Sequence, residues 1–180
     1  WLHHSLKALN DSLEGKLHIL KGDAKNLIQD IVQQHDIKQV VWNRCYQPWQ
    51  IQRDKHIKQG LKDEGIDTLS FNGALLWEPW QILNQSGSPY KVFTPYYRKG
   101  CLAQPSPRMP QSAPEKLTLR HEKALNEGID SLNLIPEIDW YVEMEKQWQP
   151  GEKGASDHLS TFLADAIGDY KKHRDEPATR

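Results

Sequence analysis

The first third of the chain carries apolar residues in patterns that predict alternating helices and strands. In Trp1 to Leu13, leucines recur at spacings of four, three and four residues, which places them on one face of a helix. Gly15 follows at the position where a left-handed C-cap is favoured. Lys16 to Lys21 alternates between polar and apolar residues, as strands do. Gly22-Asp23 then caps a second helix, which buries one apolar face made of Leu27, Ile28, Ile31 and Val32.

The pattern continues as strand, helix and strand. Val40 to Trp42 is a short β-branched and aromatic run, which predicts a strand buried on both faces. Pro48 suits the first turn of a third helix that ends at Glu64-Gly65, and Ile66 to Phe71 predicts the next strand. Asn72-Gly73 is typical of a turn that requires positive φ. The order predicts an α/β fold: a Rossmann-like parallel sheet with right-handed crossovers and helices on both faces.

The regular pattern stops after Phe71. Two short helices are expected, at 79–84 and 95–101, and prolines then dominate 103–114 as in a linker. A short helix is expected at 115–126, with extended stretches at 132–137 and 148–154. A clear amphipathic helix follows at 155–172. We therefore divide the chain into an α/β domain (1–102), an interdomain linker (103–150) and the start of an all-helical domain (151–180). Because Trp1 already lies in a predicted helix, we expect the first strand of the sheet to precede this sequence.

Composition narrows the function classes. The 180 residues are 37% hydrophobic and contain no apolar run long enough to cross a bilayer, so we expect a cytoplasmic, monomeric protein without a membrane partner. The formal net charge of −1 gives no overall field for a polyanion, and any nucleic-acid contact must use a local patch. The two cysteines form no CxxC motif, and the eight histidines lack the spacing of metal ligands, so we expect no metal site.

Candidate chemistry gathers where the strand of Val40 to Trp42 ends. Ligands of open α/β sheets bind beyond the carboxyl ends of the strands. Asn43, Arg44, Trp49 and Gln50 supply amide, guanidinium and aromatic groups at that place. We therefore expect a ligand site in this loop.

Four blocks of sequence resemble the DNA photolyase and cryptochrome family, and most of all the class I bacterial photolyases of cyclobutane pyrimidine dimers. The first two are Asn-Arg-Cys-Tyr-Gln-Pro-Trp at 43–49 with Arg53-Asp54, and Ser-Phe-Asn-Gly-Ala-Leu-Leu-Trp-Glu-Pro-Trp at 70–80. The third is Tyr-Lys-Val-Phe-Thr-Pro-Tyr-Tyr-Arg at 90–98. The fourth begins with Trp-Gln-Pro-Gly-Glu at 148–152 and extends to Pro177-Ala178. Together they cover nearly the whole chain in the family's order.

The resemblance implies a light-driven enzyme that splits cyclobutane pyrimidine dimers in DNA. In that family an α/β domain holds an antenna chromophore, and a helical domain holds FAD and the lesion base flipped out of the duplex. The family's Thr-Ser-x-Leu-Ser stretch, which cradles the FAD phosphates, is expected just past Arg180. We therefore expect that these 180 residues alone neither hold FAD nor repair DNA, and that no catalytic residue lies among them.

The resemblance also assigns roles to single residues. Tyr170 matches a tyrosine that contacts the FAD phosphates, although it also fits the apolar stripe of its helix. Arg174 matches a basic position near the DNA-binding face, or else pairs with Asp175 on the surface. Trp49 and Gln50 stand where folate-binding relatives carry an Asn-Glu pair. This departure counts against folate, and the antenna is left open between methenyltetrahydrofolate, a deazaflavin, a flavin and no antenna.

Four alternatives accompany this interpretation. A cryptochrome, a blue-light photoreceptor of the same fold without repair activity, is the main one, and the Asn43 to Trp49 loop favours the repair enzymes. An unrelated nucleotide-binding module would need a Gly-rich phosphate loop, which is absent from the sequence.

Trp49 could stack on a planar chromophore or pack against the linker. Finally, a loose basic run could contact DNA, but such runs are more often a solvated face: Lys91, Arg98, Lys99 and Arg108.

Overall fold

A computed structural model describes residues 1–120, 122 and 126–176. Their contacts form two compact units, which we treat separately. Unit 1 contains Trp1–Lys21 and Lys116–Arg180, and unit 2 contains Gly22–Glu115. Unit 1 joins both ends of the chain because segments far apart in sequence contact each other. The division into 1–102, 103–150 and 151–180 stays a prediction.

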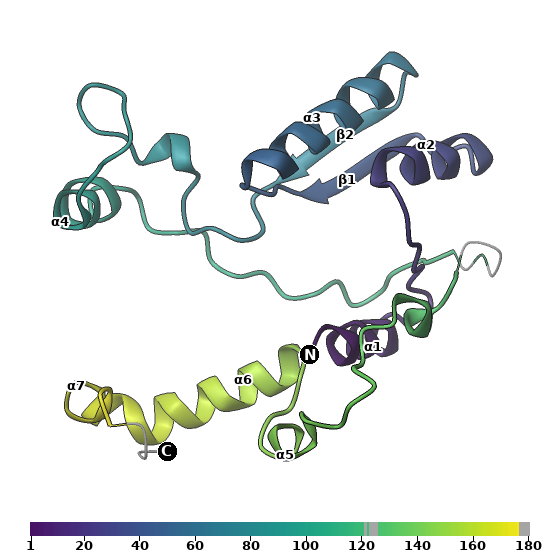
Figure 1. The fold of residues 1–180 in the computed structure, drawn as a ribbon. Helices are drawn as coiled ribbons and strands as arrows, with labels where there is room; N and C mark the ends of the chain where they lie inside the picture. The colour runs from purple at the N-terminus through teal and green to yellow at the C-terminus, as the bar shows by residue number, and fades with distance from the viewer. Residues whose placement is uncertain (121, 123–125, 177–180) are drawn as a thin grey trace. The chain divides into compact units, whose positions relative to one another are not determined.

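Unit 2 is built on a strand–helix–strand motif (Figure 1). Strand β1 (Gln39–Asn43) runs parallel to β2 (Asp67–Phe71), with Val41 opposite Leu69 in register. Helix α3 (Pro48–Asp63) connects them, with Pro48 in its first turn. This arrangement confirms the predicted parallel sheet and the order of its elements.

The core of unit 2 lies where α3 meets α2 (Ala24–Gln34). Val32, Ile57 and Leu61 are buried there, and the side chain of Leu61 is fully enclosed. Val40 of β1 packs against the same cluster, so both helices cover the same face of the sheet. Asp23 caps α2 as predicted, because its carboxylate accepts a hydrogen bond from the backbone N–H of Asn26 at 3.0 Å.

The other face of the sheet is open within unit 2. Val41 is 52% exposed, Leu69 40% and Phe71 49%. The prediction that β1 is buried on both faces is therefore wrong. An apolar run alone does not reveal how many layers cover a strand, and here α2 and α3 cover one side only.

Beyond β2, short helical turns replace regular elements. A 3-10 turn η1 (Pro79–Gln81) is followed by helix α4 (Phe93–Pro95), which continues directly into the π-type turn η2 (Tyr96–Cys101). Both helical stretches were predicted. The first was predicted to extend to residue 84 and ends at Gln81, and the second was predicted from residue 95 and begins at Phe93. Ile82 and Cys101 are buried and anchor this region.

In unit 1, α1 (Leu2–Ser12) contacts the 3-10 turn η4 (Ile129–Leu132). Gly15 has the predicted left-handed conformation, with φ of 76°. A strand at 16–21 is not observed, and the described part of 115–126 is not helical. The reason is that these segments bond to each other: the N–H of Ile19 donates to the Asn126 side chain, and the N–H of Glu127 donates to the carbonyl of Ile19. Residues 121 and 123–125 lie outside the described part.

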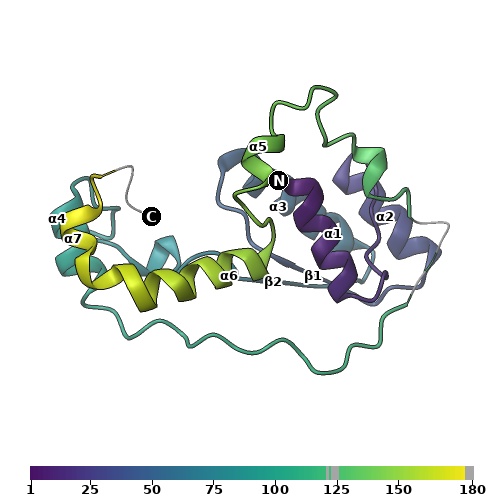
Figure 2. The ribbon, with the colours of Figure 1, turned by 90° about the horizontal axis from the view of Figure 1, so that it is seen from below.

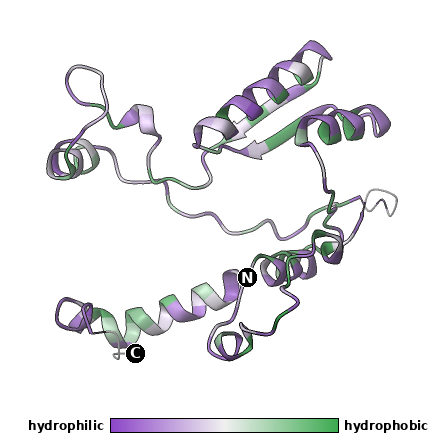
Figure 3. Cartoon of the chain, in the orientation of Figure 1, coloured by the Kyte–Doolittle hydropathy of each residue, from purple (hydrophilic) through white to green (hydrophobic). Residues whose placement is uncertain are grey.

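The C-terminal part of unit 1 is helical from α6 (Glu152–Thr161) to α7 (Tyr170–His173), as Figure 2 shows. The turns η5 (Phe162–Ala166) and η6 (Ile167–Asp169) join them. The predicted helix at 155–172 is confirmed, although α6 starts earlier and shortens the extended stretch expected up to 154. Helix α5 (Val142–Glu145) precedes it, and 133–137 has no regular structure. Figure 3 shows the apolar residues of this run gathered in its middle, between hydrophilic ends.

No helix in the described ranges is both long and apolar enough to span a membrane.

Candidate functional site

The loop after β1 is fixed by a polar cluster around a buried carboxylate. Glu78 is only 7% exposed. Its Oε1 accepts hydrogen bonds from Nε and Nη2 of Arg44 at 3.0 and 2.7 Å, and its Oε2 accepts one from the Tyr46 hydroxyl at 2.8 Å. Arg44 also donates to the carbonyl of Ser70 at 2.7 Å. The cluster therefore joins the ends of β1 and β2 to the η1 turn.

Electrostatics in this cluster favour a neutral Tyr46. Burial raises the pKa of the Tyr46 phenol, and the hydrogen bond to the Glu78 carboxylate raises that pKa further. The Arg44 guanidinium lies 5.6 Å from the centre of the Trp80 ring and adds a cation–π contact. The Arg44 guanidinium therefore makes its contacts within the protein. Glu78, at the centre of the cluster, was not predicted from the sequence.

Asn43 lies at the carboxyl end of β1 and packs against Gly73. A β-carbon on Gly73 would stand 2.5 Å from Cγ and Nδ2 of Asn43, so only glycine fits. Gly73 is not among the residues with positive φ, and the predicted reason for this glycine is therefore wrong. The turn is made instead by the Asn72 side chain, which accepts hydrogen bonds from the N–H groups of Ala74 and Leu75.

Trp49 stands in the first turn of α3 and is 61% exposed. Its indole N–H donates to the Gln47 side chain at 2.9 Å, and the Arg53 guanidinium lies 5.4 Å from its ring centre. Arg53 pairs with Asp54 at 2.7 Å, and this hydrogen bond raises the pKa of Arg53. Gln50 is half-buried. Among the described residues, no hydrogen bond or ring contact joins Trp49 to Asn43 or Arg44.

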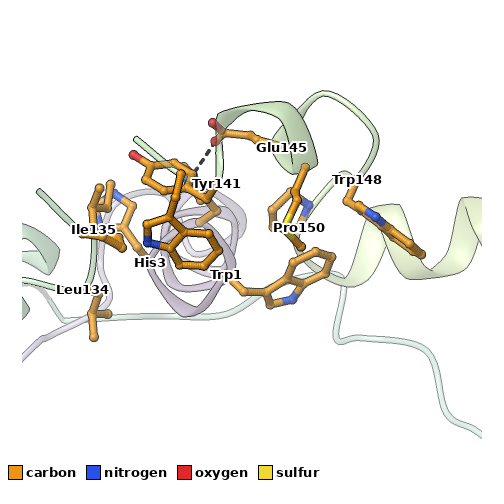
Figure 4. Close-up of a pocket in the computed structure, with 12 residues that line it drawn as sticks. Trp1, His3, Leu134, Ile135, Tyr141, Glu145, Trp148 and Pro150 are labelled. Carbon is orange, nitrogen blue, oxygen red and sulfur yellow. Dashed lines mark ion pairs between the residues drawn. The ribbon is translucent and has the colours of Figure 1, made fainter. Parts of the chain in front are cut away.

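A second candidate site is an open cavity of about 320 Å³ in unit 1 (Figure 4). Three tryptophans line it: Trp1, Trp140 and Trp148. Trp1 and Trp148 meet edge to face at 6.5 Å, and Trp140 meets Tyr141 edge to face at 5.9 Å. All three indoles are more than half exposed, so their faces are available to a planar ligand.

One ion pair lies at the cavity wall. Nε2 of His4 stands 3.1 Å from the carboxylate of Glu145, the contact dashed in Figure 4. Apart from this pair the wall is mainly apolar, and the carboxylate can accept hydrogen bonds from N–H groups of a heterocycle. Trp140 and Trp148 lie in the stretch predicted to be the interdomain linker, and no ligand was expected there. The aromatic density of 140–148 was the available signal for this cavity.

Tyr170 begins α7 in unit 1, and Arg174 caps its end, where the N–H of Arg174 donates to the carbonyl of Tyr170 at 2.9 Å. Tyr170 is half exposed, and the edge of its ring meets Phe162 at 5.9 Å. Within the described part of the chain its hydroxyl makes no hydrogen bond, so it is available to an external acceptor. Arg174 pairs with Asp175 at 3.4 Å on the surface. The described residues hold no cluster of three or more metal-ligating side chains.

The chain is similar to known proteins over most of its length. A family model described as DNA photolyase matches residues 1–115. A deoxyribodipyrimidine photo-lyase from Agrobacterium fabrum is 39% identical over 182 residues, covering 99% of this chain and 38% of that protein. Cryptochrome-1 from Arabidopsis thaliana is 28% identical, covering 97% and 26%.

A solved structure shows the same likeness. The crystal structure of a bacterial class III photolyase from Agrobacterium tumefaciens matches with a TM-score of 0.91 and 38% identity. The match covers 99% of this chain and 38% of that one. The chain therefore spans about 38% of the length of these two photolyases.

Proposed function

The chain belongs to the DNA photolyase family, and from this premise we propose that it is the light-harvesting part of an enzyme that splits cyclobutane pyrimidine dimers in DNA. The observation that carries the proposal is the likeness to photolyases over 99% of the chain, at 38% identity and a TM-score of 0.91. The plant cryptochrome is more distant, at 28% identity. The solved relative is a class III photolyase, whereas the motifs most resemble class I, so the subclass stays a prediction.

FAD and an antenna chromophore are the cofactors that the family implies for the whole protein. When bound, reduced FAD would supply the electron for light-driven splitting of the dimer. In this chain, Tyr170 fits a role in holding FAD because its hydroxyl faces no partner in the described part and can donate to a phosphate. Arg174 at the end of the same helix would assist binding of the dimer-containing DNA.

We place the antenna chromophore in the aromatic cavity of unit 1. The candidate antennas are methenyltetrahydrofolate, a deazaflavin and a flavin, all of which carry a planar heteroaromatic ring. Trp1, Trp140 and Trp148 offer faces for stacking, and Glu145 offers an acceptor for ring N–H groups. The edge of the sheet at Asn43, Arg44, Trp49 and Gln50 is the second candidate site, supported by the exposed indole of Trp49.

A binding experiment separates these two sites. Each chromophore is titrated into the 180-residue chain, and binding is followed by tryptophan fluorescence and by the absorption of the chromophore. We expect Trp140→Ala with Trp148→Ala to weaken binding by about tenfold or more, which is the loss of one good stacking contact. Trp49→Ala should leave the affinity unchanged. The reverse result would place the antenna at the sheet edge, and no binding of any of the three would refute both sites.

Repair is tested on the full-length protein. We expect illumination of the flavin-reduced protein to restore pyrimidines in DNA that contains cyclobutane dimers, with no repair in the dark. Intact dimers after illumination would contradict the proposal and favour the photoreceptor function of a cryptochrome.

A further inference from the structure

Unit 2 contains a long segment without acidic residues. All 24 aspartates and glutamates of the chain lie outside 79–114, whereas this segment carries Lys91, Arg98, Lys99 and Arg108. The chain as a whole has a net charge of −1, so positive charge is concentrated locally. A polyanion would be attracted to this segment.

The structure leaves Phe93 and Tyr97 of this segment exposed. The run from α4 into η2 is anchored on one side, where a β-carbon on Gly100 would stand 2.8 Å from Ile82 and 3.0 Å from Tyr90. On its exposed side, Phe93 and Tyr97 stack with ring centres 5.9 Å apart and planes 4° from parallel. Phe93 is 71% exposed and Tyr97 46%. Two large ring faces are thus presented to solvent together.

The basic residues around these rings carry no opposing charge. Lys91, Arg98 and Lys99 are exposed, and no carboxylate of the described residues lies within ion-pair distance of them. By contrast, Lys38, Lys146 and Lys153 each pair with an acidic neighbour. Arg108 differs from these three residues, because its guanidinium donates to the backbone carbonyl of Asn72 at 3.2 Å.

We infer that Lys91, Phe93, Tyr97, Arg98 and Lys99 form a basic aromatic surface that binds unpaired nucleotides of a nucleic-acid strand. Proteins bind single strands by stacking bases on aromatic rings while cations neutralise the phosphates. Both groups occur here within nine residues of chain. An apolar protein partner would cover the rings but leave three cations against an apolar surface, which is unfavourable. The inference needs neither flavin nor antenna, and it is therefore independent of the proposed function.

The test is binding of a fluorescently labelled oligothymidine to the 180-residue chain, followed by anisotropy at several salt concentrations. We expect the wild type to bind at low salt. The slope of log K against log salt is negative, and each phosphate contact on a single strand contributes roughly −0.7 to it. Replacing three cations, as Lys91→Gln with Arg98→Gln and Lys99→Gln, should therefore make this slope less negative by about two. Phe93→Ala with Tyr97→Ala should cost about tenfold in affinity and leave the slope unchanged.

A matched control removes the same charge elsewhere. Lys38→Gln with Lys146→Gln and Lys153→Gln changes three exposed, ion-paired lysines, and we expect the wild-type slope. Circular dichroism and thermal melting verify that every variant remains folded. Absence of wild-type binding at low salt, or an equal loss in the control, would overturn the inference. Self-association in sedimentation experiments that depends on Phe93 and Tyr97, without oligothymidine binding, would show instead a protein interface.

Discussion

Gly73 leaves room for a neighbouring side chain, and a methyl group there has a predictable cost. Because Cγ and Nδ2 of Asn43 stand 2.5 Å from the position of an added β-carbon, Gly73→Ala forces Asn43 or the turn to move. Overpacking of this kind costs about 1–3 kcal/mol. We expect the free energy of unfolding to fall by that amount in urea denaturation.

Two variants control this experiment. Gly168 has no atom within 4 Å of its added β-carbon and has no positive φ, so Gly168→Ala should stabilise the chain by roughly 0.5–1 kcal/mol. Asn43→Ala combined with Gly73→Ala should recover most of the loss, since it removes the clashing atoms. An equal loss in the double variant would show that the backbone, and not Asn43, resists the change.

The raised pKa of the Tyr46 phenol predicts that the folded chain loses stability at alkaline pH. Burial and the hydrogen bond to Glu78 raise the pKa of the phenol in the folded chain above its ordinary value of 10.0. The folded state therefore keeps its proton while the unfolded state loses it, so the stabilisation is complete below pH 10 and is lost as pH rises through the folded pKa. Urea midpoints measured from about pH 8 to pH 11 should fall accordingly.

Replacement of the hydroxyl identifies the residue responsible. Tyr46→Phe should lower stability at neutral pH, because Glu78 loses a hydrogen bond, and should flatten the alkaline decline. Tyr97→Phe, at an exposed position, should retain the wild-type decline. If Tyr46→Phe declines as steeply as the wild type, another group controls the alkaline behaviour.

The candidate residues were predictable where they depend on local sequence. The run Val40 to Trp42 predicts where its strand ends, and β1 indeed ends at Asn43, next to Arg44. Glu78 was missed because its partner Arg44 lies 34 residues away, and only the folded chain brings the two together. The cavity at Trp140 was missed for the same reason, since α1 and the 134–150 segment form it jointly.

At the scale of elements, helices were predicted well because their apolar periodicity is local. The helices containing Ile28 and Ile57 were found within a few residues of their observed bounds. The strand predicted at 16–21 failed because a strand needs a neighbour, and Ile19 bonds instead to Asn126 and Glu127. The exposure of Val41 was missed because an apolar sequence pattern does not show whether one or both faces of a strand are covered by other elements.

The packing of α3 on α2 can be tested at its most enclosed residue. Leu61 is 0% exposed and packs with Val32 and Ile57. Leu61→Ala leaves a cavity between the two helices, which costs about 2–5 kcal/mol in typical cores. We expect this loss in urea denaturation, together with loosening of unit 2 in hydrogen exchange. Leu76→Ala at a 70% exposed position should change stability by less than about 0.5 kcal/mol. Equal effects of the two substitutions would refute this assignment of the core.

At the scale of the whole molecule, the helical run from α6 to α7 bears on whether the chain can enclose FAD. Its apolar side chains are substantially exposed within the described part: Leu159, Phe162, Leu163, Ile167 and Tyr170. A helix face is convex, whereas sites for ligands typically enclose about 70–90% of the ligand surface. One such face can supply part of a flavin site but cannot enclose a flavin.

We therefore predict that the purified 180-residue chain carries no stoichiometric FAD, and that the full-length protein does; FAD is told apart from an antenna flavin by chromatography of the released cofactor. Absorption spectra of both proteins, with protein concentration determined independently, measure the ratio. In the full-length protein, Tyr170→Phe should weaken flavin binding by about ten- to a hundredfold, the value of a hydrogen bond to a charged group. Tyr97→Phe of unit 2 should leave it unchanged. One FAD per 180-residue chain would contradict the prediction, because it would require that unit 1 encloses FAD by itself.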